Sequence, residues 1–161
     1  MGLINHFRKN KNKQDNKKDE NQRTLAEDIP IAAKWAIDNL NKTGYSVDYN
    51  LESMKEVERF FNDNTGNGKK LPGNIVFALG CLVGETIIRL GGGAWQTDDK
   101  DPKGEITVAV VLENNSIIWP VLRCIKRNLN GPEENIYHYV RSMLNLDEEA
   151  KIPGIKNNKE E

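Results

Sequence analysis

The longest apolar stretch of the chain runs from Leu71 to Trp95 and reads LPGNIVFALGCLVGETIIRLGGGAW. Wound as a helix, it is apolar on nearly every side, which is typical of a helix that crosses a membrane or lies inside a domain. Glu85 and Arg89 interrupt the run before it reaches the roughly 18 apolar residues that a membrane span needs. We therefore predict a central buried helix that begins near Pro72 and ends at the glycines of positions 91–93.

Length and charge bound the class of protein. The chain has 161 residues, enough for one domain with a core, and its 23 Lys and Arg against 24 Asp and Glu leave a net charge of −1. This balance gives no overall attraction to nucleic acid, and we expect no specific nucleic-acid partner. We predict one domain over residues 24–146, a disordered basic tail over residues 1–23 and a flexible polar tail over residues 147–161.

The cysteines and the first residues bear on where the protein resides. Cys81 and Cys124 lie inside apolar runs and outside any CxxC pair, so we read them as small core residues in a reducing compartment. We expect no secretory signal and no transmembrane segment, and we predict a cytoplasmic protein. The apolar residues Leu3, Ile4 and Phe7 precede a run of lysines, which leaves open a weak contact of this tail with an anionic membrane surface. We favour a solubilising tail.

Two helices are expected before the central one. Asp28 has the right chemistry for an N-cap of the first, which Gly44 would end, and Asn50 can cap the second. Residues 45–49 alternate apolar and polar side chains and predict a short extended segment between them. The solvent-facing side of the second helix is assigned to Glu52, Lys55, Glu56 and Glu58.

Three short strands and two further helices are expected after the central helix. The strands are predicted at residues 94–97, 105–112 and 117–119, where the last two flank the turn-forming sequence ENNS. A helix follows over residues 120–130 and another opens at Pro132. Helices grouped at both ends of the strands predict an α+β fold, with a central buried helix, a small antiparallel three-strand meander and flanking helices.

Glu85 is the candidate catalytic residue, although a weak one. A carboxylate in a buried helix needs a partner or a raised pKa, and Arg89 lies one turn later, where it can reach Glu85. One reading is an ion pair that fixes helix packing, and the other is a general acid or base. We prefer the structural reading, because neither a nucleophile nor a metal-ligand cluster accompanies Glu85 in the sequence.

Two glycines of the same helix call for a structural reason. Gly80 and Gly84 are four residues apart on one helix face, and each costs about 1 kcal/mol of helix propensity relative to alanine. We predict that another element, most plausibly the sheet, approaches the helix closely at this face. Nucleotide binding by the glycines of positions 91–93 is rejected, because they follow the helix C-terminus, where the helix dipole repels an anion.

The predicted binding residues are Trp95, Trp119, Arg123, Lys126 and Arg127. The three cations form a basic cluster on the helix of residues 120–130, which is either a solvated face or a docking patch for an acidic partner or phosphates. Two distant histidines and two apolar cysteines do not make a zinc site, so no metal and no cofactor is expected.

The motifs resemble a family of uncharacterised small bacterial domains. That family carries an LGxxxGE helix, a GxxW strand start, a strand that ends in Pro and a following Lys-Arg pair. The corresponding segments here are LGCLVGE at residues 79–85, GGAW at 92–95, IWP at 118–120 and KR at 126–127, and VDYNLES at 47–53 resembles a strand-to-helix junction of the same family. The resemblance covers residues 28–144 and implies a bacterial α+β domain with no assigned activity. The charged tails and the loop of residues 98–104 depart from it.

Two hypotheses for function follow. The first is a cytoplasmic protein-interaction module, of a regulatory or immunity type, that binds an unknown protein partner through a face bearing Trp95, Trp119 and Arg123. The second is a small enzyme that uses Glu85 with Arg89 as an acid/base pair beside Trp95. A fold class alone does not choose between them, so the choice depends on the geometry of the site.

Overall fold

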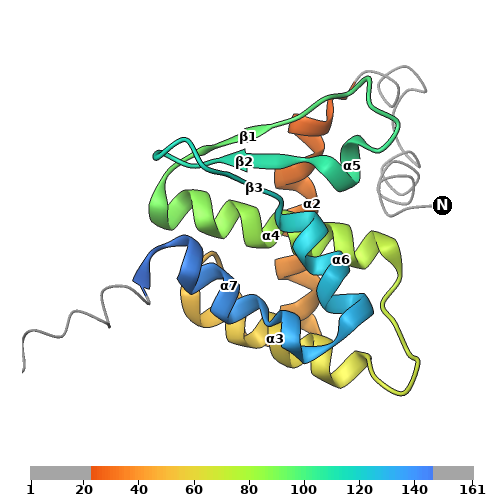
Figure 1. Ribbon diagram of the computed structural model, residues 1–161. Helices are drawn as coiled ribbons and strands as arrows, with labels where there is room; N and C mark the ends of the chain where they lie inside the picture. The colour runs from red at the N-terminus through yellow and green to blue at the C-terminus, as the bar shows by residue number, and fades with distance from the viewer. Residues whose placement is uncertain (1–22, 147–161) are drawn as a thin grey trace, which may run out of the picture.

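The computed structural model describes residues 23–146 (Figure 1). Its elements follow in the order α2 (Leu25–Lys42), α3 (Leu51–Asn64), α4 (Gly73–Gly91), β1 (Ala94–Gln96), α5 (Gly104–Thr107), β2 (Ala109–Val111), β3 (Ile117–Ile118), α6 (Pro120–Asn130), the 3-10 turn η2 (Pro132–Glu134) and α7 (Ile136–Met143). The α+β prediction is confirmed, because the strands form one small antiparallel sheet with helices before and after it. Of the tail predicted over residues 1–23, the structure describes only Arg23, which forms an ion pair with Asp28 at 3.0 Å; residues 1–22 and the predicted tail of residues 147–161 lie outside the described residues.

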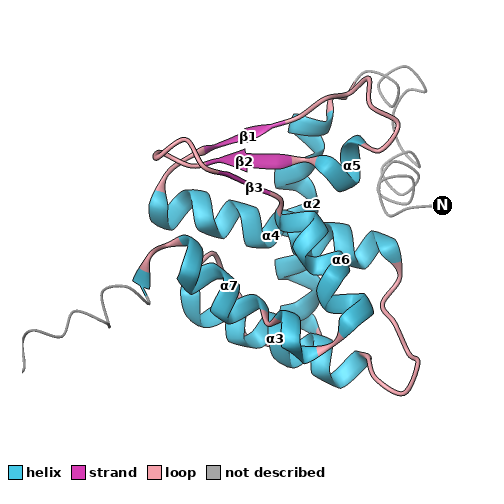
Figure 2. Ribbon diagram, viewed as in Figure 1, coloured by secondary structure: helices cyan, strands magenta, loops and turns pink. Residues whose placement is uncertain are grey.

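The predicted central helix is α4. It packs chiefly against α2 and α6, and Figure 2 shows it between the sheet and the pair formed by α3 and α7. Within residues 23–146, α4 is the one helix long and apolar enough to cross a membrane, and 61% of its most apolar window is buried inside the protein. Its fully buried residues include Ala78, Leu82, Val83 and Ile87, as in the core helix of a domain. The prediction that this stretch is buried is confirmed.

The first helix starts earlier than the sequence suggested. Thr24 is the N-cap of α2: its Oγ1 accepts the main-chain N–H of Glu27 at 3.3 Å, and the Glu27 carboxylate accepts the N–H of Thr24 at 2.8 Å. This reciprocal pair is a capping box. The prediction that Asp28 caps the helix is wrong, because Asp28 lies buried in the first turn, 3.0 Å from Nε of Arg23. The cap predicted at Asn50 is confirmed, since its side chain accepts the N–H of Ser53 at 2.9 Å.

One predicted extended segment joins no sheet, and one predicted strand is shorter than expected. Residues 45–49 join no sheet. The side-chain amide of Asn41 instead accepts the main-chain N–H of Val47 at 2.7 Å and donates to the Val47 carbonyl at 2.9 Å. The strand predicted over residues 105–112 is wrong in its first half, which forms the single turn α5. There the Asp101 carboxylate accepts the hydroxyl of Thr107 at 2.9 Å and stabilises the turn. Only residues 109–111 are left for β2.

Candidate functional site

The Glu85–Arg89 pair predicted from the sequence is present at the edge of α4. Glu85 Oε2 lies 3.6 Å from Arg89 Nε, and Glu85 Oε1 accepts the indole N–H of Trp95, which β1 supplies, at 2.9 Å. The Arg89 guanidinium stacks 3.6 Å from the ring centre of Tyr49, a residue of the α2–α3 connection. Three segments therefore meet at one partly buried carboxylate.

The contacts of Glu85 and Arg89 fix these side chains in the structure and leave the carboxylate little access to a substrate. The Glu85 side chain is 15% exposed and that of Arg89 is 52% exposed, so the pair sits at the rim of the core. Both carboxylate oxygens already have a partner, and Glu85 lines neither of the hollows described below. Burial raises the pKa of the Tyr49 hydroxyl, while the Arg89 cation acts in the opposite direction. Tyr49 is therefore protonated at neutral pH, and its face holds Arg89.

The two helix glycines permit close approach, as predicted. A Cβ added to Gly84 would lie 2.1 Å from Cη2 of Trp95, so the indole occupies the space of the missing side chain. A Cβ added to Gly80 would lie 2.5 Å from Cα of Val121. The sheet is thus the neighbour at Gly84, whereas at Gly80 the neighbour is α6.

The structure does not bring Trp95 and Trp119 to one face. Trp95 pairs with Val110, which pairs with Ile118, and this row of side chains faces α4. Side chains of a strand alternate between the two faces of a sheet. Ile117, next to Ile118, therefore points away from α4, and both it and Trp119 are 46% exposed. The predicted binding face accordingly keeps Trp119 and loses Trp95.

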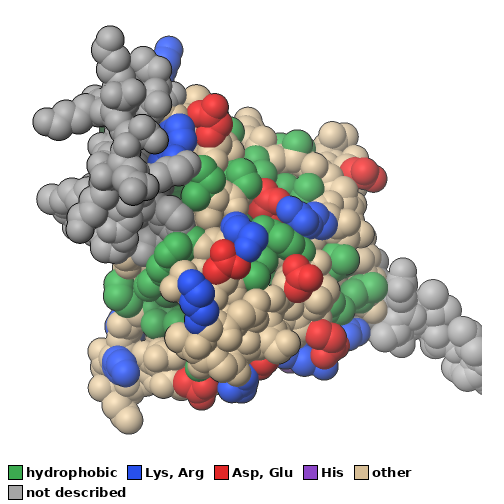
Figure 3. Space-filling view, turned by 180° about the vertical axis from the view of Figure 1, so that it is seen from behind, with side chains coloured by type: hydrophobic (Ala, Val, Ile, Leu, Met, Phe, Trp, Pro, Cys, Tyr) green, Lys and Arg blue, Asp and Glu red, His purple; other side chains and the backbone are tan. Residues whose placement is uncertain are grey.

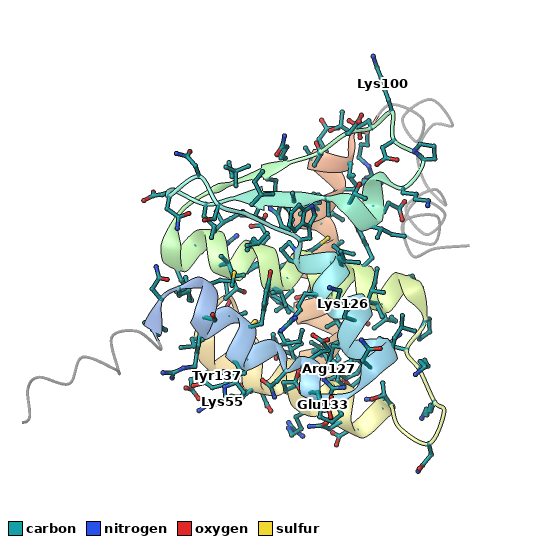
Figure 4. All side chains as sticks on the ribbon, viewed as in Figure 1. Lys55, Lys100, Lys126, Arg127, Glu133 and Tyr137 are labelled. Atoms are coloured by element: carbon teal, nitrogen blue, oxygen red, sulfur yellow. The ribbon has the colours of Figure 1, made fainter. Side chains whose placement is uncertain are left out.

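Arg127 is a core residue, so the prediction of an exposed basic cluster is wrong at this position. Its side chain is 0% exposed, and its Nε lies 3.0 Å from both carboxylate oxygens of Glu58. Asn62 accepts a second hydrogen bond from the guanidinium at 2.8 Å. Glu58 itself is buried, which also corrects its assignment to the solvent-facing side of α3. Figure 4 shows Arg127 beside Lys126 on α6.

A groove remains beside β3, and we call it the β3 groove. It measures about 250 Å³ and is lined by Ile117, Ile118, Trp119, Leu122, Arg123, Lys126, Tyr139 and Met143. Three segments build it: β3 with the adjoining Trp119, α6, and α7 through Tyr139 and Met143. The sequence pattern indicated Trp119, Arg123 and Lys126, whereas Tyr139 was missed, because only the packing of α7 against α6 brings it there.

The charged and aromatic side chains of the β3 groove contact one another and Glu134, and these contacts fix the position of Arg123. Arg123 Nη1 lies 2.7 Å from Glu134 Oε2, and its guanidinium carbon is 4.8 Å from the ring centre of Tyr139. Lys126 is exposed at the rim, and the residues that line the groove include two cations and no acid. Burial strongly raises the pKa of Tyr139, so this side chain is neutral across the physiological range. The groove thus combines an apolar floor with a positive rim.

Within the part of the chain that the structure describes, the His, Cys, Asp and Glu side chains form no group of three or more that could hold a metal ion. The expectation of a protein without metal or cofactor stays a prediction. Comparisons of the chain with protein-family models, with curated proteins and with solved structures gave no match. The resemblance to bacterial domains also stays a prediction.

Proposed function

We propose that this protein is a protein-binding module that holds its partner in the β3 groove. The observation that carries this proposal is the pair Ile117 and Trp119, each 46% exposed and both lining one hollow. Single exposed apolar residues are ordinary on a protein surface, but a tryptophan at the edge of a groove is the residue type that dominates binding energy in interfaces.

The setting of Arg123 supports the same proposal. Its contacts with Glu134 and the Tyr139 ring hold the guanidinium in one place before any partner arrives. A side chain that is already ordered loses less conformational entropy on binding than a free one. The groove therefore presents an aromatic anchor and an ordered cation together, which suits specific recognition of another protein.

The setting in the cell belongs to the proposal as well. We propose a bacterial, cytoplasmic module of a regulatory or immunity type, supported by the motif resemblance and by two free, buried cysteines, which a reducing compartment would preserve. The alternative, an enzyme that uses Glu85 with Arg89, has less support, because the carboxylate is already engaged by Trp95 and Arg89.

The experiment compares affinity capture by the tagged full-length protein, its Trp119→Ala variant and its Lys100→Ala variant. Lys100 is an exposed residue of the β1–α5 loop, far from the groove, and serves as the matched control (Figure 4). We expect a partner that the wild type and Lys100→Ala retain and that Trp119→Ala binds at least about tenfold more weakly, as for an interface hot spot. Calorimetry with the purified partner measures the loss. Equal binding by a Trp119→Ala protein with an unchanged melting temperature would refute the proposal.

A further inference from the structure

We infer that the β3 groove receives an extended segment of the partner protein, in which acidic and apolar residues alternate, and that this segment lies along β3. The inference deepens the proposed function by naming the chemistry of the partner. It rests on three observations: the free edge of β3, the position of the groove on that edge, and the sign of the charge at its rim.

β3 is an edge strand with a free side. The sheet order is β1-β2-β3, so β3 is paired to β2 alone. The N–H of Leu112 donates to the carbonyl of Ser116 at 2.8 Å, and the Leu112 carbonyl accepts the N–H of Asn115 at 2.9 Å, so both main-chain groups of Leu112 face the returning arm of the hairpin. Because hydrogen-bonded and non-hydrogen-bonded pairs alternate, the N–H and carbonyl of Ile117 point away from β2. Main-chain groups on such an edge can bind an added strand.

The β3 groove follows this free edge. Its walls come from β3 on one side and from α6 and α7 on the other. A second hollow of about 480 Å³, lined by Leu90, Leu112 and Leu144 among others, adjoins it, since Met143 lines both. A segment along β3 therefore finds apolar side chains on both sides of Met143, although the second hollow is also lined by Glu113, so the attraction for acidic residues is confined to the β3 groove. β3 is only two residues long, so side chains in these hollows must supply most of the affinity.

The charge of the rim selects acidic residues. An extended segment places alternate side chains on opposite sides. One set can enter the apolar floor of Leu122, Tyr139 and Met143, while the other reaches Lys126 and Arg123 at the rim. Arg123 is already held by Glu134, so Lys126 is the cation with which an incoming carboxylate would pair. A carboxylate in this position adds favourable Coulomb energy and speeds encounter.

A second copy of the chain fits the groove less well than an acidic segment of another protein. In a two-fold symmetric pair each copy presents the same surface to the other. Arg123 of each copy is already paired with its own Glu134, so the lining of the β3 groove would bring the two Lys126 side chains together without a carboxylate from the lining to pair with them. The partner is therefore a different protein that carries the acids itself.

The test uses the ¹⁵N-labelled full-length protein and two blocked octapeptides, one alternating Val with Glu and the other alternating Val with Lys. NMR titration follows the amides of Ile117 and Trp119 and the Trp119 indole. We expect the Glu peptide to shift these signals and to bind at least about tenfold more tightly than the Lys peptide. Lys126→Glu should reverse that preference, whereas the matched change Lys100→Glu, outside the groove, should leave it unchanged.

Several outcomes would overturn the inference. One is that neither peptide shifts the groove signals, and another is that Lys126→Glu leaves the preference unaltered. Signals that move with protein concentration in the absence of peptide would make a second copy the occupant. Signals that move when the acids at 147–149 are changed to Lys would make this chain's own segment the occupant.

Failure of the inference is distinguishable from failure of the proposed function. If Trp119→Ala abolishes partner capture but the peptides show no charge preference, the function stands and the inference fails. If the peptides bind as expected while Trp119→Ala captures the same proteins as the wild type, the proposed function fails.

Discussion

Arg127 of α6 and Glu58 of α3 form an ion pair inside the core, with Nε 3.0 Å from both carboxylate oxygens. The same carboxylate accepts the main-chain N–H of Ile136, the first residue of α7, at 2.6 Å. One acidic side chain of α3 thus joins three helices, two of which, α6 and α7, lie more than 50 residues further along the chain. Because α6 and α7 build two walls of the β3 groove, this pair also holds the groove in shape.

Breaking this buried ion pair should lower the free energy of unfolding more than breaking an ion pair on the surface does. Glu58→Gln or Arg127→Met should each lower the free energy of unfolding by about 3–5 kcal/mol, because each leaves the opposite buried charge without a compensating charge. The double variant Glu58→Leu/Arg127→Met should recover much of that loss, since both charges are gone. Urea denaturation measures all three.

Arg59 is the control for these variants, because it is adjacent to Glu58 but half-exposed, with an ion pair to Glu56. Arg59→Met should cost at most about 1 kcal/mol. A cost below about 1 kcal/mol for Arg127→Met would show that the buried pair does not hold the three helices together.

Gly84→Ala should destabilise the protein although alanine favours helices. The new Cβ would lie 2.1 Å from the Trp95 ring, so the indole must move and its hydrogen bond to Glu85 must weaken. Overpacking of this kind costs about 1–3 kcal/mol, against a gain of about 1 kcal/mol in helix propensity. Thermal unfolding should show a lower melting temperature than the wild type.

Gly73→Ala is the matched control in the same helix, because no heavy atom lies within 4 Å of the added Cβ. That variant should be neutral or more stable. Should Gly84→Ala prove as stable as Gly73→Ala, the packing of Trp95 against this glycine would be of no consequence.

Glu85→Gln separates the structural role of Glu85 from a catalytic one. Glutamine keeps the oxygen that accepts the Trp95 indole N–H and loses only the ion pair with the half-exposed Arg89, so unfolding free energy should fall by less than about 1 kcal/mol. Trp119→Ala is the comparison, and only that variant should lose partner binding. Loss of binding or of an activity in a fully folded Glu85→Gln protein would favour the catalytic reading instead.

Acid should weaken the protein partly through Glu56. Two hydrogen bonds from Arg59 and one from the N–H of Ser46 lower the pKa of Glu56 to about 2. A depressed pKa in the folded state gives stability that is complete above the ordinary glutamate pKa and is lost as the pH falls toward 2. In Glu56→Gln the melting temperature should therefore fall less steeply between about pH 4.5 and 2.

Glu52→Gln provides the control for the pH series, since Glu52 is a highly exposed side chain on the same helix. Its melting curve should follow the wild type across the acid range. An unchanged slope for Glu56→Gln would mean that the hydrogen bonds from Arg59 and Ser46 do not shape the acid response.

Several features of the candidate site could be predicted from residues close together in the sequence. Glu85 and Arg89 share a helix face at a four-residue spacing, so their pairing needed only the helix itself. The wrong assignment of Glu58 was avoidable in part. Glu58 lies four residues after Met54 and three before Phe61, which places it on the buried stripe of α3. The negative charge of Glu58 favoured a solvent-exposed position. The cation that compensates this charge in the core, Arg127, lies 69 residues further along the chain.

The sequence by itself determined that residues 73–91 form a buried helix, because their apolar side chains surround the helix and cannot all face water. It also determined the cap at Asn50 and the helix of residues 120–130, whose end depends on the neighbouring glycine alone. Only the tertiary structure decided that Arg127 is buried while Lys126, its neighbour on α6, faces solvent, and that Trp95 packs against Gly84 of α4 while Trp119 stays half-exposed in the β3 groove. The physical reason is that burial of a charge or an indole depends on partners from distant segments, which no local pattern records.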